Sequence, residues 1–177
     1  MTRRVVLIRL LEQYVSADDR EEADRCAMLR LAHELGDPLS RDEPRAHFTA
    51  SAYVVDSEGR RTCLVTHAKL DRLLQPGGHV EPSDISLEAA ALREAHEETS
   101  LEVTLHPKAP RPFDLDIHEI PGRPSEGAHF HLDVRYLVVG RGKPGAGAAW
   151  YEIGAAGDPS VGRLAAKALS LGTRPAS

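Results

Sequence analysis

Three glutamates in one short stretch of the sequence have the spacing of a metal site. Glu94, Glu97 and Glu98 stand at i, i+3 and i+4, which places them on one face of an α-helix. Leu87 and Ala91 fall on the same stripe, so a helix docked by its apolar half carries the glutamates toward the protein. Like charges one turn apart repel, and a divalent cation would neutralise them. Oxygen ligands favour Mg²⁺ or Mn²⁺.

A glycine pair and an arginine complete the pattern around these glutamates. Gly77 and Gly78 precede the helix as a turn, and Arg93 stands directly before Glu94. An isolated pair of glutamates is most often a solvated helix face, but this combination favours a functional site. The segment from Gly78 to Leu101 resembles the Nudix box, G-x5-E-x7-R-E-U-x-E-E-x-G-U, in which U is an aliphatic residue.

The segment departs from the Nudix pattern at two places. Fourteen residues separate Gly78 from Arg93 where the pattern has thirteen, so the loop holds one extra residue. Counting forward from Gly78 places Asp84 at the position of the family glutamate, whereas counting back from Arg93 shifts the match by one residue. Glu81 and Asp84 are the candidate partners of Arg93. Ser100 replaces the glycine that ends the helix, which costs about 1 kcal/mol if the backbone there is left-handed.

The resemblance implies a fold, a reaction and a role for each of these residues. Nudix proteins are α/β/α sandwiches that hydrolyse a nucleoside diphosphate linked to another moiety. By this resemblance the metal ligands are Glu94, Glu97, Glu98 and the backbone carbonyl of Gly78, and the catalytic group is Glu98, Glu97 and Arg93. A divalent cation can screen diphosphate oxygens and lower the pKa of a bound water, while a carboxylate orients or deprotonates that water.

Two strands with a polar face follow the box. Residues 113–118 and 129–136 alternate strictly between polar and apolar side chains, which predicts a strand in each. Three interpretations of the polar faces remain open: a solvent-facing side of an antiparallel sheet, a substrate-binding wall, or an additional histidine-rich metal site. Similar His-x-His-x-Asp segments occur in Nudix proteins in which a histidine follows the glycine pair, as His79 does here. By this resemblance His79 is grouped with the polar strand residues. The predicted substrate-binding residues are His79, His129, His131, Asp133 and Arg135.

Other polar and aromatic residues have simpler interpretations. His96 lies on the helix side away from the glutamates, so solvent exposure or packing is expected. Trp150 and Tyr151 open a late strand and are expected to pack in the core, with stacking on a nucleobase as the alternative. Lys69 and Arg72 are, with Arg135, the nearest phosphate partners along the chain.

Composition and charge exclude several classes of protein. The chain has 177 residues, of which 41% are hydrophobic, and can bury one core. A net charge of −5 argues against binding to a nucleic-acid polymer. Cys26 and Cys63 are far apart and form no C-x-x-C pair, which indicates reduced thiols and a cytoplasmic location. The first apolar run is brief and interrupted by Arg9 and Glu12, so neither a signal peptide nor a membrane span is expected.

Periodicity and helix breakers predict the elements that position the box. Residues 4–15 and 19–35 read as helices within an N-terminal helical extension, residues 1–45. The Nudix-like domain is expected over residues 46–172, with a hairpin of strands 48–55 and 62–67. Its box helix is expected at residues 87–99, followed by a strand at 101–105 and a last helix from Asp158. Residues 173–177 are expected to form a disordered tail.

We therefore expect an α/β fold, a Nudix-like α/β/α sandwich with a mixed sheet and a short N-terminal helical extension. The expected activity is Mg²⁺- or Mn²⁺-dependent hydrolysis of a small-molecule nucleoside diphosphate derivative. Two alternatives are a non-catalytic nucleotide sensor, in which the extra loop residue has disabled the site, and an isomerase or hydrolase of a non-nucleotide diphosphate. The sequence leaves the substrate undecided and is compatible with a homodimer.

Overall fold

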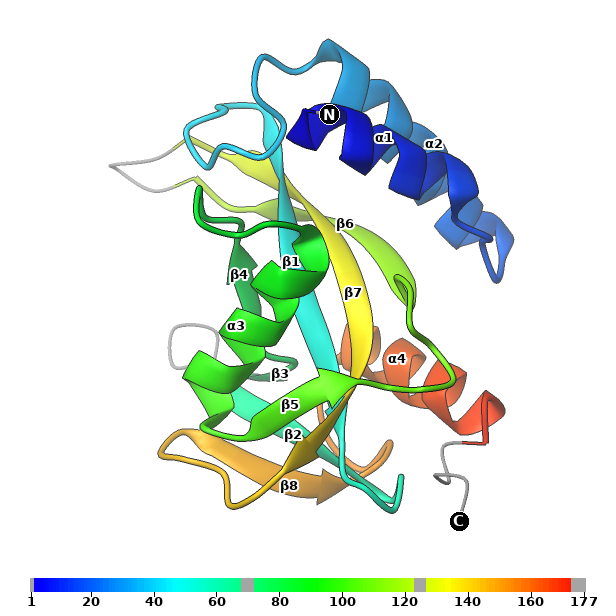
Figure 1. Ribbon diagram of the computed structural model, residues 1–177, viewed down its shortest axis with the longest axis vertical. Helices are drawn as coiled ribbons and strands as arrows, with labels where there is room; N and C mark the ends of the chain where they lie inside the picture. Colours follow the sequence, from blue (N-terminus) through cyan, green and yellow to red (C-terminus); the bar gives the residue numbers. More distant parts are fainter. Residues whose placement is uncertain (1, 68–71, 123–126, 173–177) are drawn as a thin grey trace.

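Two long parallel strands form the centre of the structure, a computed structural model that describes residues 2–67, 72–122 and 127–172. Strands β1 (Ala46–Val55) and β7 (His129–Arg141) pair from Ala46 opposite Phe130 to Val55 opposite Val139. Figure 1 shows them in cyan and yellow, running side by side through the molecule. Both strands are buried over most of their length, as expected for parallel strands covered on two faces.

Six shorter strands extend this pair into an eight-stranded mixed sheet. They are β2 (Arg61–His67), β3 (Arg72–Leu74), β4 (Gly77–His79), β5 (Glu102–Leu105), β6 (Asp114–Ile120) and β8 (Ala148–Glu152). Strands β2 and β4 pair antiparallel with β1, β3 and β8 flank β2, and β5 and β6 pair antiparallel with β7. The predicted hairpin and the two predicted polar-faced strands are confirmed.

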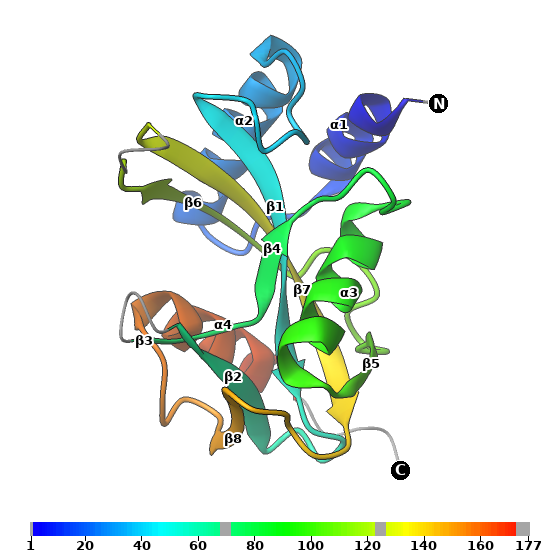
Figure 2. The ribbon, with the colours of Figure 1, turned by 90° about the vertical axis from the view of Figure 1, so that its left-hand side faces the viewer.

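Helices cover both faces of the central strands. Helix α3 (Leu87–Thr99) and helix α4 (Pro159–Ser170) lie on opposite sides of them, as Figure 2 shows. Helices α1 (Arg3–Gln13) and α2 (Asp19–Glu34) lie together at one end of the sheet. The expected α/β/α arrangement with a mixed sheet and an N-terminal helical pair is confirmed. Among the described residues, no helix combines the length and the apolar character needed to cross a membrane.

The two faces of the central strands bury separate hydrophobic clusters. Val134 and Tyr136 of β7 belong to the cluster that includes Leu87 of α3 and Leu7 and Leu11 of α1. The other cluster joins strand residues such as Tyr53 and Leu137 to the apolar side of α4. Because alternate residues of β7 point to opposite faces, the α4 face also carries Asp133 and Arg135 further up the strand. That face is therefore apolar at one end and polar at the other.

The glycine pair lies in a strand, and the prediction of a turn there is wrong. Gly77 and Gly78 belong to β4, opposite Ser51 and Ala50 of β1, and neither has a positive φ. A Cβ on Gly77 would lie 2.2 Å from the Cβ of Ser51, which is closer than side chains approach. Glycine is required here because the two strands come too close for a side chain.

Helix α3 ends in the left-handed conformation that its sequence pattern implies. Ser100 has φ 59° and ψ 14°, and it is the one non-glycine residue with a positive φ in the described part of the chain. Its N–H donates to the carbonyl of His96 at 2.8 Å, which closes the last turn. Leu101 follows at once and is fully buried. Serine therefore holds a backbone geometry that favours glycine.

We expect Ser100→Gly to raise the free energy of unfolding by about 1 kcal/mol, because glycine adopts this conformation without strain from a Cβ. Urea unfolding followed by circular dichroism measures the change. Ser100→Ala is the matched control, since alanine removes the hydroxyl but keeps the strained Cβ. A Ser100→Gly variant no more stable than Ser100→Ala would show that the backbone conformation is not strained.

Candidate active site

Helix α3 brings the glutamate stripe to strand β4. The helix begins at the N-cap Ser86, whose hydroxyl accepts a hydrogen bond from the Ala89 N–H at 3.1 Å. Its apolar side is buried through Ala90, Ala91 and Ala95, so the carboxylates one turn further along reach the edge of the sheet. The helix predicted at residues 87–99 is observed with the same bounds.

Glu94 and Glu98 lie against the backbone of the glycine pair. A Cβ built on Gly78 would stand 2.7 Å from the carboxylate carbon of Glu94, so this carboxylate fills the space that a side chain would occupy. The N–H of Gly77 donates to Oε2 of Glu98 at 3.0 Å. Two carboxylates from successive turns of α3 thus flank one short stretch of extended backbone.

Burial and mutual repulsion make both carboxylates more basic than usual. Burial raises the pKa of Glu94, against the lowering effect of the neighbouring Arg93. Glu98 keeps contact with solvent, but the part of its side chain that packs against the protein is desolvated, which raises its pKa. The negative charges of Glu94 and Glu97 raise the pKa of Glu98 further. Glu97 and Glu98 are both exposed, with 56% of the Glu97 side chain accessible, whereas only 16% of the Glu94 side chain is exposed.

Arg93 is the structural centre of this group. Its Nε and Nη2 donate to the two carboxylate oxygens of Asp84 at 3.1 and 2.9 Å, and Nη2 also donates to the carbonyl of His79 at 3.0 Å. Its Nη1 donates to Glu94 at 2.8 Å and to Glu97 at 3.1 Å. The guanidinium therefore ties the loop, strand β4 and helix α3 together. These contacts are those of a positioning residue, and the catalytic role expected for Arg93 from the sequence stays a prediction.

Asp84 is the acidic partner of Arg93, a choice that the sequence left open between Glu81 and Asp84. Its carboxylate also accepts the N–H of Glu81 at 2.8 Å, so Glu81 supports the pair through its backbone. Burial alone would raise the pKa of Asp84, but the hydrogen bonds from Arg93 and Glu81 outweigh it and hold the pKa below its ordinary value. The next residue, Ile85, is 90% exposed. The loop therefore absorbs its extra residue at the surface.

The donor set fits a hard divalent cation. Glu94 and Glu98 offer carboxylate oxygens on either side of a backbone stretch that carries no side chain, and oxygen ligands suit Mg²⁺ and Mn²⁺. The three glutamates do not converge on one point, because Glu94 and Glu97 share Nη1 of Arg93 while Glu98 turns to Gly77. Glu94 and Glu98 are thus the better placed of the predicted ligands.

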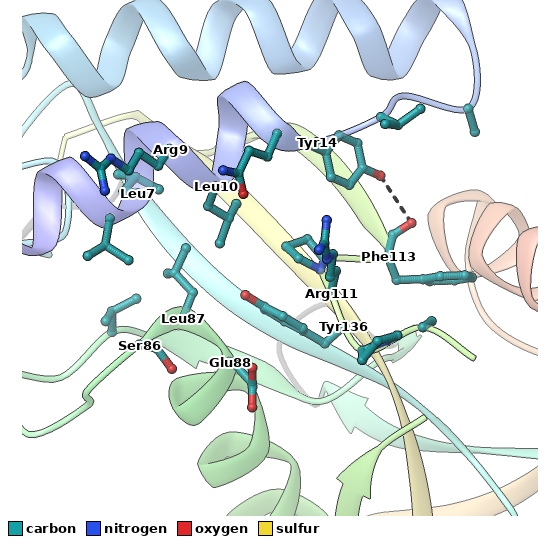
Figure 3. A pocket seen from close by; sticks show the side chains of 18 of the residues that line it. Leu7, Arg9, Leu10, Tyr14, Ser86, Leu87, Glu88, Arg111, Phe113 and Tyr136 are labelled. Carbon is teal, nitrogen blue, oxygen red and sulfur yellow. Dashed lines mark hydrogen bonds between the residues drawn. The ribbon is translucent and has the colours of Figure 1, made fainter. Parts of the chain in front are cut away.

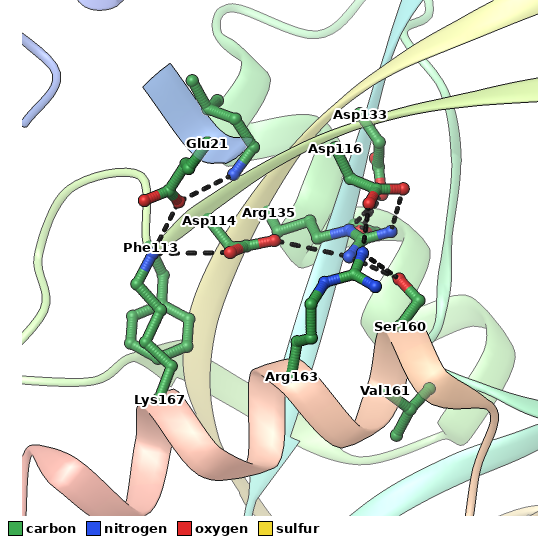
Figure 4. Close-up of polar contacts among 12 residues, drawn as sticks. Glu21, Phe113, Asp114, Asp116, Asp133, Arg135, Ser160, Val161, Arg163 and Lys167 are labelled. Atoms are coloured by element: carbon green, nitrogen blue, oxygen red, sulfur yellow. Dashed lines mark hydrogen bonds and ion pairs between the residues drawn. The ribbon is translucent and has the colours of Figure 1, made fainter. Parts of the chain in front are cut away.

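The polar faces of β6 and β7 are buried at Asp114, Asp116, Asp133 and Arg135, so the interpretation that these side chains meet solvent is wrong. Arg135 lies among carboxylates, as Figure 4 shows, and donates to Asp133 at 2.9 Å and to Asp116 at 2.8 Å. Helix α4 closes over it, and Ser160 accepts a further hydrogen bond from Arg135 at 2.8 Å. Only 2% of the Arg135 side chain is exposed.

These contacts give Asp133 and Arg135 a structural role, and their binding of substrate stays a prediction. Asp133 accepts hydrogen bonds from Thr49 at 3.0 Å and from Ser51 at 2.7 Å, so it ties β7 to β1. A buried arginine fork satisfied by several acceptors is costly to open, because each group would lose its partner. Asp133 and Arg135 therefore hold the central strands together.

The predicted histidines gather with one residue that the sequence analysis missed. The ring of His131 lies 5.2 Å from that of His79 and 4.9 Å from that of His47, between centroids. His129 stacks on His47 at 5.0 Å and is itself buried. His79 and His131 are half-buried and keep contact with solvent. The missed residue, His47, is the register partner of His131, a pairing that only the strand order reveals.

The remaining residues singled out in the sequence have structural environments. His96 is exposed, and its Nδ1 contacts the carbonyl of Leu101 at 2.8 Å. Trp150 packs against the core as expected, with the guanidinium of Arg61 5.5 Å from its ring centroid. Arg72 faces Asp158 at 3.8 Å. Lys69 and the tail at 173–177 lie outside the described residues.

A cavity of about 850 Å³ lies between α1 and the start of α3, away from the glutamates. Figure 3 shows Leu10 of α1 and Tyr14, which follows α1, facing Leu87 of α3 and Tyr136 of β7 across it. Helix α1 and the residues just after it therefore form one wall of a concave surface. It meets α3 at Ser86, Leu87 and Glu88, at the opposite end of the helix from Glu98.

Comparison with protein families identifies one family. The model of the NUDIX domain matches residues 45–159. A solved hydrolase of the NUDIX family from Clostridium perfringens is 25% identical with a TM-score of 0.53, over 72% of this chain and 98% of that chain. An Ap4A hydrolase from C. elegans is 18% identical (TM-score 0.48, 70% and 96% covered), and a UDP-X diphosphatase is 15% identical (TM-score 0.45, 96% and 93% covered). No curated protein matches.

We expect Asp84→Asn to destabilise the protein by about 3 kcal/mol at neutral pH, because it removes the main anionic partner of a largely buried Arg93. Since the pKa of Asp84 is lower in the folded than in the unfolded chain, its stabilising effect is present above about pH 4 and is lost as the pH falls through the folded value. Urea unfolding of both proteins at several pH values measures this.

The difference in stability between wild type and Asp84→Asn should accordingly shrink below about pH 4. Asp42→Asn is the control, because Asp42 is an exposed loop aspartate and its substitution should change little at any pH. A difference between wild type and Asp84→Asn that stays constant down to pH 2.5 would contradict the paired carboxylate.

Proposed function

Because this chain belongs to the NUDIX family and is an enzyme of the pyrophosphohydrolase type, we propose that it cleaves a diphosphate linkage in a nucleoside diphosphate derivative by attack of water, with Mg²⁺ or Mn²⁺. The substrates we favour are small molecules of the cytoplasm rather than nucleic-acid polymers, in keeping with the net charge of −5. The observation that carries the proposal is the pair Glu94 and Glu98 against the glycine backbone of β4.

The residues that would hold the cation are Glu94 and Glu98, with the carbonyl of Gly78, and Glu97 as a further ligand or base. When bound, the ion supplies charge neutralisation of the diphosphate oxygens and acidifies water. Arg93 fixes the position of α3 relative to β4 through its contacts with Asp84 and the His79 carbonyl. The chain thus fixes its carboxylates before substrate arrives, which lowers the cost of organising them during the reaction.

Proton removal from the attacking water is the role we assign to Glu98. Its Oε2 is oriented by the Gly77 N–H, which leaves Oε1 to accept the proton as the water oxygen bonds to phosphorus. The bond between that phosphorus and the bridging oxygen breaks, and the second phosphate leaves with the bridging oxygen. Glu97 lies on the same exposed side of α3 and is the alternative base. Its Oε2 accepts a hydrogen bond from Arg93, and its Oε1 would accept the proton.

The moiety beyond the diphosphate is expected to lie toward His79 and His131. His79 follows the glycine pair directly, and both rings are half-buried at the edge of β4. Burial, reinforced by the nearby histidines, lowers the pKa of His131 to about 2, so this ring would meet substrate as a neutral hydrogen-bonding group.

The alternative of a non-catalytic nucleotide sensor assumed that the extra loop residue disables the site. The Arg93–Asp84 pair is intact despite this residue, which speaks against that alternative.

We expect Glu98→Gln to keep the fold and to lower turnover by about 100-fold or more, because it removes both the charged ligand and the base while preserving shape. The assay is phosphate-product release with Mg²⁺ over nucleoside triphosphates, dinucleoside polyphosphates, nucleotide sugars and ADP-ribose. Glu102→Gln is the control, since Glu102 is an exposed glutamate on the adjoining strand β5. Retention of more than half of wild-type turnover by Glu98→Gln would remove Glu98 from the reaction.

Removal of the metal should also change stability. At about a hundredfold excess over its dissociation constant, a cation that binds only the folded chain adds roughly 2.7 kcal/mol, so Mg²⁺ or Mn²⁺ should raise the melting temperature. Without metal, we expect Glu98→Gln to be more stable than wild type, because it relieves the repulsion from Glu94 and Glu97. Thermal unfolding with chelator and with millimolar Mg²⁺ measures both effects.

Glu94→Gln provides the contrast in this experiment. It should also lose the response to metal, but it should not gain stability without metal, because Glu94 is paired with Arg93 at 2.8 Å. A wild-type melting temperature that metal leaves unchanged, at concentrations that support turnover, would mean that the glutamates are a solvated helix face.

A further inference from the structure

We propose that His47, His79 and His131 form a second metal site, for Zn²⁺, separate from the carboxylates of α3. Each of the three rings offers one nitrogen, and these atoms all lie within 4.8 Å of one another. Among the described residues, this is the group of three or more histidine, cysteine or acidic side chains whose ligand atoms come that close.

Three different strands hold the ligands in place. His47 on β1 and His131 on β7 are register partners in the parallel pair, and His79 on β4 pairs with Thr49, two residues further along β1. The ring centroids form a nearly equilateral triangle, with sides of 5.0, 4.9 and 5.2 Å. A site on neighbouring strands of one sheet is held more precisely than a site on loops.

Neighbouring groups limit the movement of the rings. His129 stacks on His47 and is anchored by the Gly127 carbonyl, 3.0 Å from its Nδ1. His118 lies edge-on to His131 at 5.4 Å and contacts Asp116 at 3.1 Å. The carbonyl of His79 is held by Arg93. The rings of His47 and His131 are thus packed against other imidazoles, and the backbone of His79 is fixed by Arg93.

The protonation of the cluster suits metal binding. Burial is the main cause that lowers the pKa of His131, and the charges that His118, His47, His79 and His129 would carry lower it further. Several imidazolium ions within about 5 Å of one another would repel strongly. A neutral imidazole has a free lone pair on one nitrogen, which is the form that coordinates a metal.

The ligand type selects the metal. Three nitrogen ligands with a fourth position left to water are typical of zinc, whereas Mg²⁺ and Mn²⁺ prefer the oxygens of Glu94 and Glu98. In a tetrahedral site with zinc–nitrogen bonds of about 2.0–2.1 Å, ligand nitrogens are about 3.3 Å apart. Zinc binding therefore requires the three nitrogens, which lie within 4.8 Å of one another, to move closer together. The two sites share strand β4, since His79 follows Gly78 directly.

The experiment measures zinc binding to the untagged, chelator-treated full chain. Calorimetry should find zinc bound in the Glu94→Gln/Glu98→Gln background, where the carboxylate site is disabled, and Mg²⁺ should not compete for it. His79→Ala and His131→Gln in the same background should each weaken zinc binding by at least about 100-fold. His33→Ala is the control, because His33 is exposed on α2. Circular dichroism checks the fold of every variant.

The visible absorption of bound Co²⁺ tests the same site without any histidine variant. Co²⁺ added to the Glu94→Gln/Glu98→Gln chain should give the intense visible absorption of tetrahedral coordination, and zinc should displace it. Octahedral Co²⁺, absence of zinc binding in this background, or unchanged affinity in both His79→Ala and His131→Gln would overturn the proposal. Because the carboxylates are already removed, these outcomes are distinct from failure of the proposed hydrolase activity.

Discussion

The site depends on the five hydrogen bonds of one guanidinium group. Arg93 joins Asp84 in the loop, Glu94 and Glu97 on α3 and the carbonyl of His79 on β4. The forked shape of arginine allows this, since a lysine could not bind Asp84 through two parallel bonds. If this group were lost, the glutamates would remain on their helix but would no longer be fixed relative to the glycine backbone. The same bond to His79 connects the carboxylates with the histidine cluster.

A second buried arginine plays the corresponding role on the other face of the sheet. Arg135 is enclosed by Asp114, Asp116 and Asp133 and by the start of α4, and Asp133 continues the network to β1. Desolvation raises the pKa of Asp114 to about 6, whereas contacts with His118 and Arg135 overcome desolvation and hold that of Asp116 at about 2. Such a network costs solvation energy, and its value lies in fixing the register of the central strands.

Local sequence signals predicted most of the elements but not their pairing. The periodicity of α3, its serine N-cap and the alternation in β6 and β7 are determined by neighbouring residues, so they could be read directly. The parallel pairing of β1 with β7 joins residues more than eighty positions apart, and no local pattern encodes it. His47 was missed for that reason. Strand β4 was predicted as a turn because a glycine pair is typical of turns, whereas here the glycines allow β4 to lie close to β1.

The same limit explains the assignments within the site. The box residues were located because the motif is contiguous, whereas the choice of Asp84 over Glu81 required the geometry of the loop. Alternation showed that Asp133, Arg135 and His131 share one face, but it could not show that α4 covers Arg135 and leaves His131 half-buried. Burial of a polar strand face depends on what packs against it, which lies elsewhere in the sequence.

We propose that water attacks a diphosphate at the carboxylates of α3. This proposal is tested most directly by running the reaction in water enriched in ¹⁸O, with Mg²⁺ and the best substrate of the panel, and analysing the products by mass spectrometry. Hydrolysis predicts one ¹⁸O atom in a phosphate group of one product for every bond cleaved. Products without the label, formed at the same rate, would show that the chain catalyses a transfer or an isomerisation and would contradict the account.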